Sequence, residues 1–186
     1  MHRRHLLTLL GSASVPLLSG CVTSRDVLLE NFSTHNDIDV SLTGEVIQQP
    51  TEDGPLRIEL SLTNDGPKRE LEFFHTPPLK FTSSDIRVVV VPDDRESITT
   101  FNPEEPDKFV PETPEDGCWR SLNRIPVGGG RQLERRTFNV DDTLTERYTL
   151  LATPEAEACF PAGTHRFTNR IHVNDDHQLH FDLVIP

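Results

Sequence analysis

The sequence predicts an all-β fold, an antiparallel β-sandwich of about eight or nine strands. Three observations predict it. Apolar and polar residues alternate with a period of two along several segments, which is typical of strands with one buried face. Turn-forming residues separate these segments at short intervals. No stretch shows a sustained apolar stripe with the helical period of about 3.6 residues.

The first two alternating segments are residues 38–43 and 56–63. Their apolar positions are, in order, Ile38, Val40, Leu42, Leu56, Ile58, Leu60 and Leu62. The turn-forming stretch Gln49–Pro55 separates the two segments, so the two strands are expected to form a hairpin. A second turn is expected at Asn64–Pro67.

The next segment, Ile86–Val91, is a β-branched run that predicts a strand buried on both faces or central to a sheet. Residues 92–117 combine acidic residues with five prolines and predict a long surface loop, with one short strand at residues 98–101. These prolines are Pro92, Pro103, Pro106, Pro111 and Pro114.

Further strands are expected beyond this loop, at residues 118–122, 131–140, 147–152, 165–173 and 178–185. The last two alternate clearly and are separated by Asn174–Asp176, so we expect a terminal hairpin with Ile171 opposite Leu179. No internal repeat is present. The expected β-sandwich domain therefore covers residues 37–186.

Residues 1–20 are predicted to be a signal peptide. Arg3 and Arg4 precede an apolar stretch, residues 6–18, that is shorter than the roughly 20 residues needed to cross a bilayer. The paired arginines resemble a twin-arginine export signal, and Leu18–Cys21 (Leu-Ser-Gly-Cys) resembles a lipobox. The alternative is an ordinary leader cut elsewhere, with Cys21 incidental.

The lipobox resemblance implies that Cys21 becomes the first residue and carries a lipid that holds the protein on the membrane. We therefore expect residues 21–36 to be a lipidated tether with a first strand or turn. The expected location is extracellular, on the outer face of the cytoplasmic membrane.

The chain carries a net charge of −12, which argues against nucleic acid as a partner because no basic stripe is available for phosphates. Its 18 basic residues include only three lysines, Lys68, Lys80 and Lys108. Abundant carboxylates with few lysines resemble the proteins of salt-loving archaea. The alternative is an ordinary acidic protein with a bias toward arginine.

Two cysteines remain if Cys21 carries lipid. In an oxidising compartment an even number of thiols favours a disulfide, so Cys118 and Cys159 are predicted to pair. The alternative is two buried free thiols.

Four histidines, His165, His172, His177 and His180, lie near the end of the chain. In the expected hairpin register His172 and His180 share the outer face, where they could bind a divalent ion with Asp175 or Asp176. The alternative is that polar positions on a solvated strand face happen to be histidine. A blue-copper site is disfavoured, because the only methionine is Met1 and the spacing from Cys159 to His165 is too long.

No catalytic motif is present: the chain lacks a Gly-x-Ser-x-Gly elbow, a His-Glu-x-x-His pair and a phosphate-binding loop. No catalytic residue and no cofactor are therefore predicted. The acidic pairs Asp93-Asp94, Asp141-Asp142 and Asp175-Asp176 are interpreted as solvated turns rather than acid–base pairs or calcium ligands.

Residues 38–186 resemble exported immunoglobulin-like domains in the order of their strands and in the segment Pro161-Ala162-Gly163 that introduces a late strand. They are also weakly similar to the bacterial proteinase-inhibitor β domain. These resemblances transfer no functional residue. The expected function is a non-enzymatic binding module with a surface protein or glycan as partner. The alternatives are a carboxylate-dependent hydrolase on a β-sandwich and a protease-inhibitor-like domain.

Overall fold

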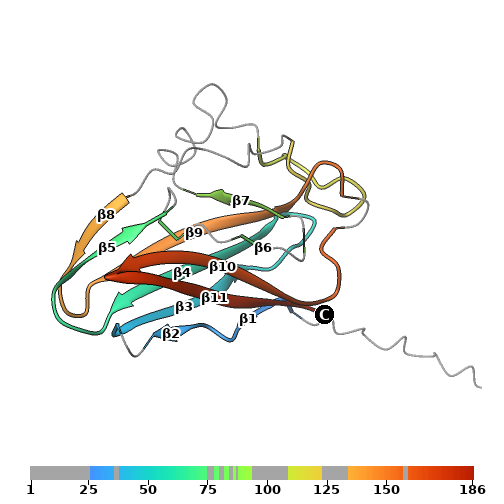
Figure 1. Cartoon of the computed structure of the whole chain (residues 1–186). Coiled ribbons are helices and arrows are strands. Elements are labelled where there is room, and N and C mark those ends of the chain that lie inside the picture. Colours follow the sequence, from blue (N-terminus) through green and yellow to red (C-terminus); the bar gives the residue numbers. More distant parts are fainter. Residues whose placement is uncertain are drawn as a thin grey trace, which may run out of the picture.

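The computed structural model describes residues 26–35, 38–74, 78–79, 82–83, 86, 88–93, 109–122, 134–156 and 159–186. In these residues eleven strands form two antiparallel sheets, which confirms the predicted all-β sandwich (Figure 1). The strands are β1 Leu28–Glu30, β2 Thr34–His35, β3 Val40–Gln48, β4 Leu56–Asn64, β5 Arg69–Phe73, β6 Thr82–Ser83, β7 Val88–Pro92, β8 Glu134–Phe138, β9 Thr143–Ala152, β10 Gly163–Val173 and β11 Asp175–Ile185.

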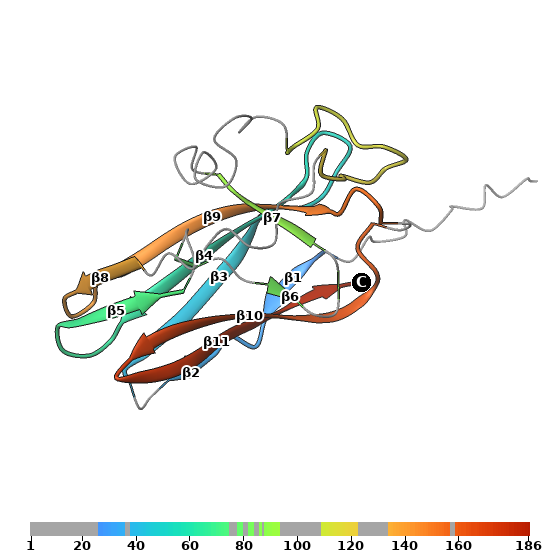
Figure 2. The ribbon, with the colours of Figure 1, turned by 45° about the horizontal axis from the view of Figure 1, so that its top comes forward.

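The six-stranded sheet has the order β1-β11-β10-β5-β8, with β6 paired to β10 next to β5. The five-stranded sheet has the order β2-β3-β4-β9-β7. Figure 2 shows the two layers, with β10 and β11 in one and β3, β4 and β9 in the other. Alternate side chains of each strand point between the layers, so the period of two in the sequence becomes one continuous core.

The core contains the apolar positions that the alternation predicts. Along β4 every second residue is buried, from Leu56 to Leu62. The opposite sheet contributes Phe167 and Phe181, whose stacked rings lie 5.1 Å apart. Tyr148 from β9 is the largest fully buried side chain among the described residues.

Both predicted hairpins are present, but the register predicted for the second one is wrong. β3 and β4 pair from Val40 opposite Asn64 onward. In β10–β11, Ile171 lies opposite His177, and Leu179 lies opposite Asn169. The reason is the turn, in which Asn174 alone separates the two strands, with a positive φ of 62°. Asparagine tolerates that left-handed conformation.

Several observed strands differ from the predicted ones. β1 and β2 lie within the predicted tether, for which a first strand or turn was expected, and β1 pairs with β11, so the sheets begin before residue 37. β5, which pairs with β8 and β10, and β6, which pairs with β10, were not predicted. β9 starts earlier than predicted, at Thr143, and β8 ends earlier, at Phe138. The strand predicted at residues 98–101 and the first residues of the segment predicted at 131–140 lie outside the described residues.

The strand predicted at residues 118–122 is wrong. This segment makes only isolated bridges, Glu115 with Cys118 and Arg120 with Ala152. Trp119 of this segment instead belongs to a second small core on the outer side of β7 and β9, made of Val89, Val91, Phe109, Trp119 and Leu151. This cover explains why β7 is buried on both faces although it is an edge strand of its sheet.

The two ends of the sandwich differ in what they carry. At one end lie the connections 65–68 and 139–142 and the turn at Asn174; we call this the corner end. At the other lie the start of β1, the turn 49–55 and the disulfide loop 109–122; we call this the tether end. At the corner end the paired strands β4 and β9 pass into the paired strands β5 and β8 of the other sheet.

Candidate functional site

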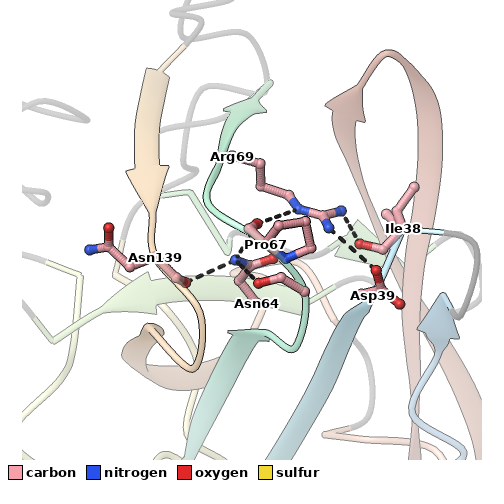
Figure 3. Close-up of polar contacts among 7 residues, drawn as sticks. Ile38, Asp39, Asn64, Pro67, Arg69 and Asn139 are labelled. Carbon is pink, nitrogen blue, oxygen red and sulfur yellow. Dashed lines mark hydrogen bonds and ion pairs between the residues drawn. The ribbon is translucent and has the colours of Figure 1, made fainter.

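The corner end is organised around the buried amide of Asn64, the last residue of β4. Its Nδ2 donates to the carbonyl oxygens of Gly66 at 3.1 Å, Pro67 at 3.1 Å and Asn139 at 2.8 Å (Figure 3). Its backbone N–H donates to Asp142 O at 3.0 Å. The segment Asn-Asp-Gly-Pro that predicts a turn therefore also holds the neighbouring connection 139–142 in place.

Arg69, the first residue of β5, joins this corner to the start of β3. Its guanidinium donates to Pro67 O at 3.2 Å and to Ile38 O, and it lies 3.5 Å from a carboxylate oxygen of Asp39 (Figure 3). Asp39 has a positive φ of 44°. Because three partners hold the guanidinium, the Arg69 side chain is fixed in position at this corner.

A hollow of about 600 Å³ lies between this corner and the tip of the β10–β11 hairpin. Its lining combines apolar and polar groups: Ile38, Pro67, Arg69, Glu70, Glu72, His172, Val173 and Asn174. The hollow has the size of a small-ligand site. Sequence analysis did not find it, because its residues come from the segment before β3, from β5 and β10, and from two turns.

Most charged groups of the hollow are paired. Glu72 accepts from Arg135 at 2.6 Å, and His172 Nδ1 lies 2.8 Å from Asp176 Oδ1. Glu70 is exposed on the same outer face of β5 as Glu72, two residues away. The Cα atoms of residues two apart on a strand are separated by about 6.7 Å. The hollow thus presents carboxylate, amide and imidazole groups beside the apolar side chains of Ile38, Pro67 and Val173.

The outer face of the five-stranded sheet carries hydroxyl groups over its half nearest the corner end. Two cross-strand rows contain Ser41, Thr63 and Thr143, and next to them Thr43, Ser61 and Thr145. Within these rows, Thr63 Oγ1 lies 2.9 Å from Thr143 Oγ1, and Ser61 Oγ lies 2.9 Å from Thr145 Oγ1. We call these six residues the hydroxyl face; neither row contains a charged side chain.

The next row of the same sheet is charged. Arg147 donates to Glu59 at 2.6 Å, and this hydrogen bond raises the pKa of the guanidinium above its ordinary value. Glu45 lies opposite Glu59 on the other side. The hydroxyl face therefore ends at a row of charged residues.

On the outer face of the six-stranded sheet, Asp182 is buried beneath Arg166. Nε and Nη2 of Arg166 donate to the two carboxylate oxygens at 2.8 and 3.0 Å, and Asn31 Nδ2 donates to Oδ2 at 2.9 Å. The hydrogen bond from Arg166 is the main reason that the pKa of Asp182 is lowered; Asn31 adds to it, while burial acts in the opposite direction. This cluster attaches the turn after β1 to the sheet.

The predicted disulfide is confirmed. Cys118 and Cys159 are bonded, with their Cα atoms 5.4 Å apart. A second hollow, of about 420 Å³, lies beside this loop and is lined in part by Pro111, Leu122 and Pro154. The residues of the predicted leader and anchor, Arg3, Arg4 and Cys21, lie outside the described residues.

The structure separates the clustered histidines. Since Asp176, not His180, is the residue near His172, the predicted pairing of His172 with His180 is wrong. His165 is buried and its Nε2 lies 2.8 Å from Pro161 O. In the part of the chain that the structure describes, no three His, Cys, Asp or Glu residues are grouped as metal ligands. Cys159 is no copper ligand, because its sulfur is bonded to Cys118.

Comparison of the chain with protein-family models, with curated proteins and with solved structures finds no match. The resemblance to exported immunoglobulin-like domains and the weaker similarity to the proteinase-inhibitor β domain therefore stay predictions. Across the described ranges no helix is long and apolar enough to cross a membrane.

Proposed function

We propose that the protein is an exported binding module, held on the outer face of the cytoplasmic membrane by a lipid on Cys21. The corner end of the sandwich binds its partner. The observation that carries the binding role is the hollow between Arg69 and Asn174, whose walls are fixed by hydrogen bonds before any ligand arrives. Such preorganisation lowers the entropic cost of binding.

A glycan of the cell surface is the partner that fits best. Carboxylates in the hollow can accept hydrogen bonds from sugar hydroxyls, and the amide can both donate and accept them. The hydroxyl face, on the outer side of the other sheet at the same end of the sandwich, adds six groups, each of which can donate and accept. The hydroxyl face carries no charged side chain, so it suits a neutral glycan and adds no local repulsion of an acidic one, which a chain with a net charge of −12 otherwise repels.

The binding role is tested by glycan-array binding in molar salt. We expect that Thr43→Val with Thr145→Val, which removes exposed hydroxyls at similar side-chain volume, weakens binding at least several-fold. Thr164→Val, at an exposed threonine on the other sheet, is the matched control and should leave binding unchanged. If the wild-type protein binds no glycan and cross-links to a surface protein instead, the partner is a protein.

The anchor is tested separately. Cys21→Ser should release the protein into the medium or leave it as an uncleaved precursor. Arg3→Lys with Arg4→Lys should retain it in the cytoplasm if the twin-arginine route is used. A mature Cys21→Ser protein that still requires detergent for extraction would contradict the lipid anchor, and normal secretion of the double lysine variant would indicate the general secretory route.

One observation favours a second function, a carboxylate-dependent hydrolase. Glu70 and Glu72 share the outer face of β5 and both line the hollow. Their Cα atoms are about 6.7 Å apart, so their carboxyl groups can reach the separations that glycosidases use. A hydrolase screen in molar salt separates this function from binding. Activity that Glu70→Gln abolishes would establish the enzyme. The protease-inhibitor alternative gains no supporting contact in the described residues.

A further inference from the structure

The start of β1 is joined to the turn 49–55 at the tether end. The backbone N–H of Val27 donates to Gln49 Oε1 at 2.9 Å, and Gln49 Nε2 donates back to Val27 O at 2.8 Å. The same turn accepts a hydrogen bond at Thr51 O from the indole of Trp119, at 2.7 Å. The first residues of the domain and the disulfide loop therefore lie at the same end, as Figure 1 shows.

Exposed apolar side chains gather at this end. Among the described residues, five large apolar side chains are exposed: Leu28, Ile47, Val110, Leu122 and Val140. Four of them belong to the tether end, because they lie in β1, directly before the turn 49–55, or in the loop 109–122. Val140 is the exception and lies in the connection 139–142 at the corner end. Contiguous exposed apolar surface is typical of sites that contact a protein or a membrane, so the tether end is the candidate for such a contact.

The length of the tether identifies that phase. Only five residues, 22–26, separate Cys21 from Val27. Even fully extended, this chain spans about 20 Å. An anchor of that length keeps the tether end within reach of the bilayer at all times, and it raises the effective concentration of the apolar side chains at the lipid surface.

We propose that the tether end of the sandwich docks on the lipid bilayer that holds the anchor, with Leu28, Val110 and Leu122 inserted at the interface. The inference rests on the proposed lipid anchor at Cys21. Docking in this orientation directs the corner end, with its hollow and hydroxyl face, away from the membrane.

Charge does not drive this docking. The tether end carries several exposed carboxylates, Glu52, Asp53, Glu115 and Asp116 among them, which an anionic membrane surface would repel. In molar salt the Debye length is about 3 Å, so this repulsion is screened while apolar contacts persist. Docking should therefore strengthen as salt is added, the opposite of attraction by basic residues.

Trp119 provides the test, because it is the only tryptophan of the chain and lies three residues from Leu122. The mature protein, as purified from cells with detergent, is reconstituted into phosphatidylcholine vesicles in molar salt, with and without bromine on the acyl chains. Brominated lipid quenches tryptophan fluorescence only at short range. We expect a loss of Trp119 emission in brominated vesicles.

A double variant and a single control test the docking, and two of their positions have matched exposure. Leu122 is 57% exposed and Val140 is 53% exposed, at opposite ends of the sandwich. Leu122→Asp combined with Leu28→Asp should abolish the quenching, whereas Val140→Asp should leave it as in the wild type. Because all three positions are exposed, the variants should fold, and near-ultraviolet circular dichroism checks this.

Flotation of the same vesicles separates the two proposals. Protein that floats without loss of Trp119 emission is anchored but undocked, which overturns the docking alone. Protein that does not float has no anchor, which overturns the anchor and the docking with it. Equal quenching in the Leu28→Asp, Leu122→Asp variant and the wild type also overturns the docking through these residues.

Discussion

The phenol of Tyr148 is fully buried between the two sheets, and its hydroxyl has no hydrogen-bond partner among the described residues. Burial is the main reason that its pKa is raised well above the ordinary value, so the group stays neutral over the range in which the protein is handled. A buried hydroxyl without a partner costs the free energy of its lost hydration. Its ring, by contrast, fills the core.

Tyr148→Phe should therefore leave the fold unchanged and raise the free energy of unfolding by up to about 1 kcal/mol. Chemical denaturation in molar salt measures this difference. Tyr148→Leu, which leaves a cavity, is the comparison and should lower stability. A clear loss of stability in the phenylalanine variant would mean that the hydroxyl has a partner that stabilises it.

Asp182 is the opposite case, a buried carboxylate with every oxygen bonded. Its pKa is lowered in the folded protein, so folding favours the ionised form. The stabilisation is therefore present above the pKa of the unfolded chain, about 3.9, and it is lost as the pH falls through the lower pKa of the folded state.

Asp182→Asn should lower the free energy of unfolding by roughly 1.5–3 kcal/mol at neutral pH, the range for hydrogen bonds to charged groups. The difference from the wild type should shrink as the pH falls below about 4. Melting curves of both proteins across this range test the sign. Asp175→Asn, at an exposed carboxylate on the same strand, is the matched control for the change in charge.

The disulfide loop is an element without regular strands that nevertheless closes a small core. Cys118 and Cys159 are separated by 41 positions in the sequence, and their bond holds Trp119 over β7 and β9. Cross-linking a loop of this length stabilises by about 4 kcal/mol in the chain-entropy model.

Cys118→Ser with Cys159→Ser should lower the free energy of unfolding by about this amount, 4 kcal/mol or somewhat less. Loss of the clamp should also expose Trp119 and shift its emission to longer wavelength. Reduction of the wild-type protein should reproduce both effects. Unchanged melting after reduction, with the thiols shown to be free by alkylation, would contradict a stabilising role.

Strands in which apolar and polar residues alternate over many positions were predictable from the sequence, and short strands were not. β4 has four buried apolar residues at period two, and no turn or helix fits that pattern. β5 has only Leu71 and Phe73, too few to distinguish a strand from an extended turn, and it forms because β8 and β10 lie on either side of it. β1 likewise depends on its pairing with β11.

The candidate site was less predictable than the fold. The disulfide could be inferred from the number of cysteines, but the hollow depends on which turns meet at the corner end. Asn64 signals only a turn in the sequence, and its contact with Asn139 joins residues 75 positions apart. The register of β10–β11 depends on the single residue Asn174, and a shift of two positions moved His180 away from His172.

At the scale of the whole molecule, the charge predicts how the protein responds to salt. A net charge of −12 opposes the compact state through self-repulsion, and removal of a leader with two arginines would make the mature chain more negative. Ions screen this repulsion. We expect the melting temperature to fall steadily as the salt concentration is lowered from molar to physiological values.

The control for the effect of salt compares two sodium salts that differ in their anion. Sodium chloride and sodium perchlorate screen charge equally, so a common trend below molar concentration indicates screening, whereas opposite trends indicate specific ion effects on apolar surface. A melting temperature that stays constant over this range would contradict an adaptation to high salt.

The pairing of β1 with β11 also determines how the domain bears mechanical force. The two strands are antiparallel, so the start of β1 lies beside the end of β11. Pulling the chain ends apart would open the pairs Leu28–Val184, Leu29–Leu183 and Glu30–Asp182 one after another. If the proposed partner binds the corner end and the proposed anchor holds the tether end, a load between them runs along the strands instead. It would strain these hydrogen bonds together, so the domain should withstand tension best in the direction in which a tethered cell-surface protein is pulled.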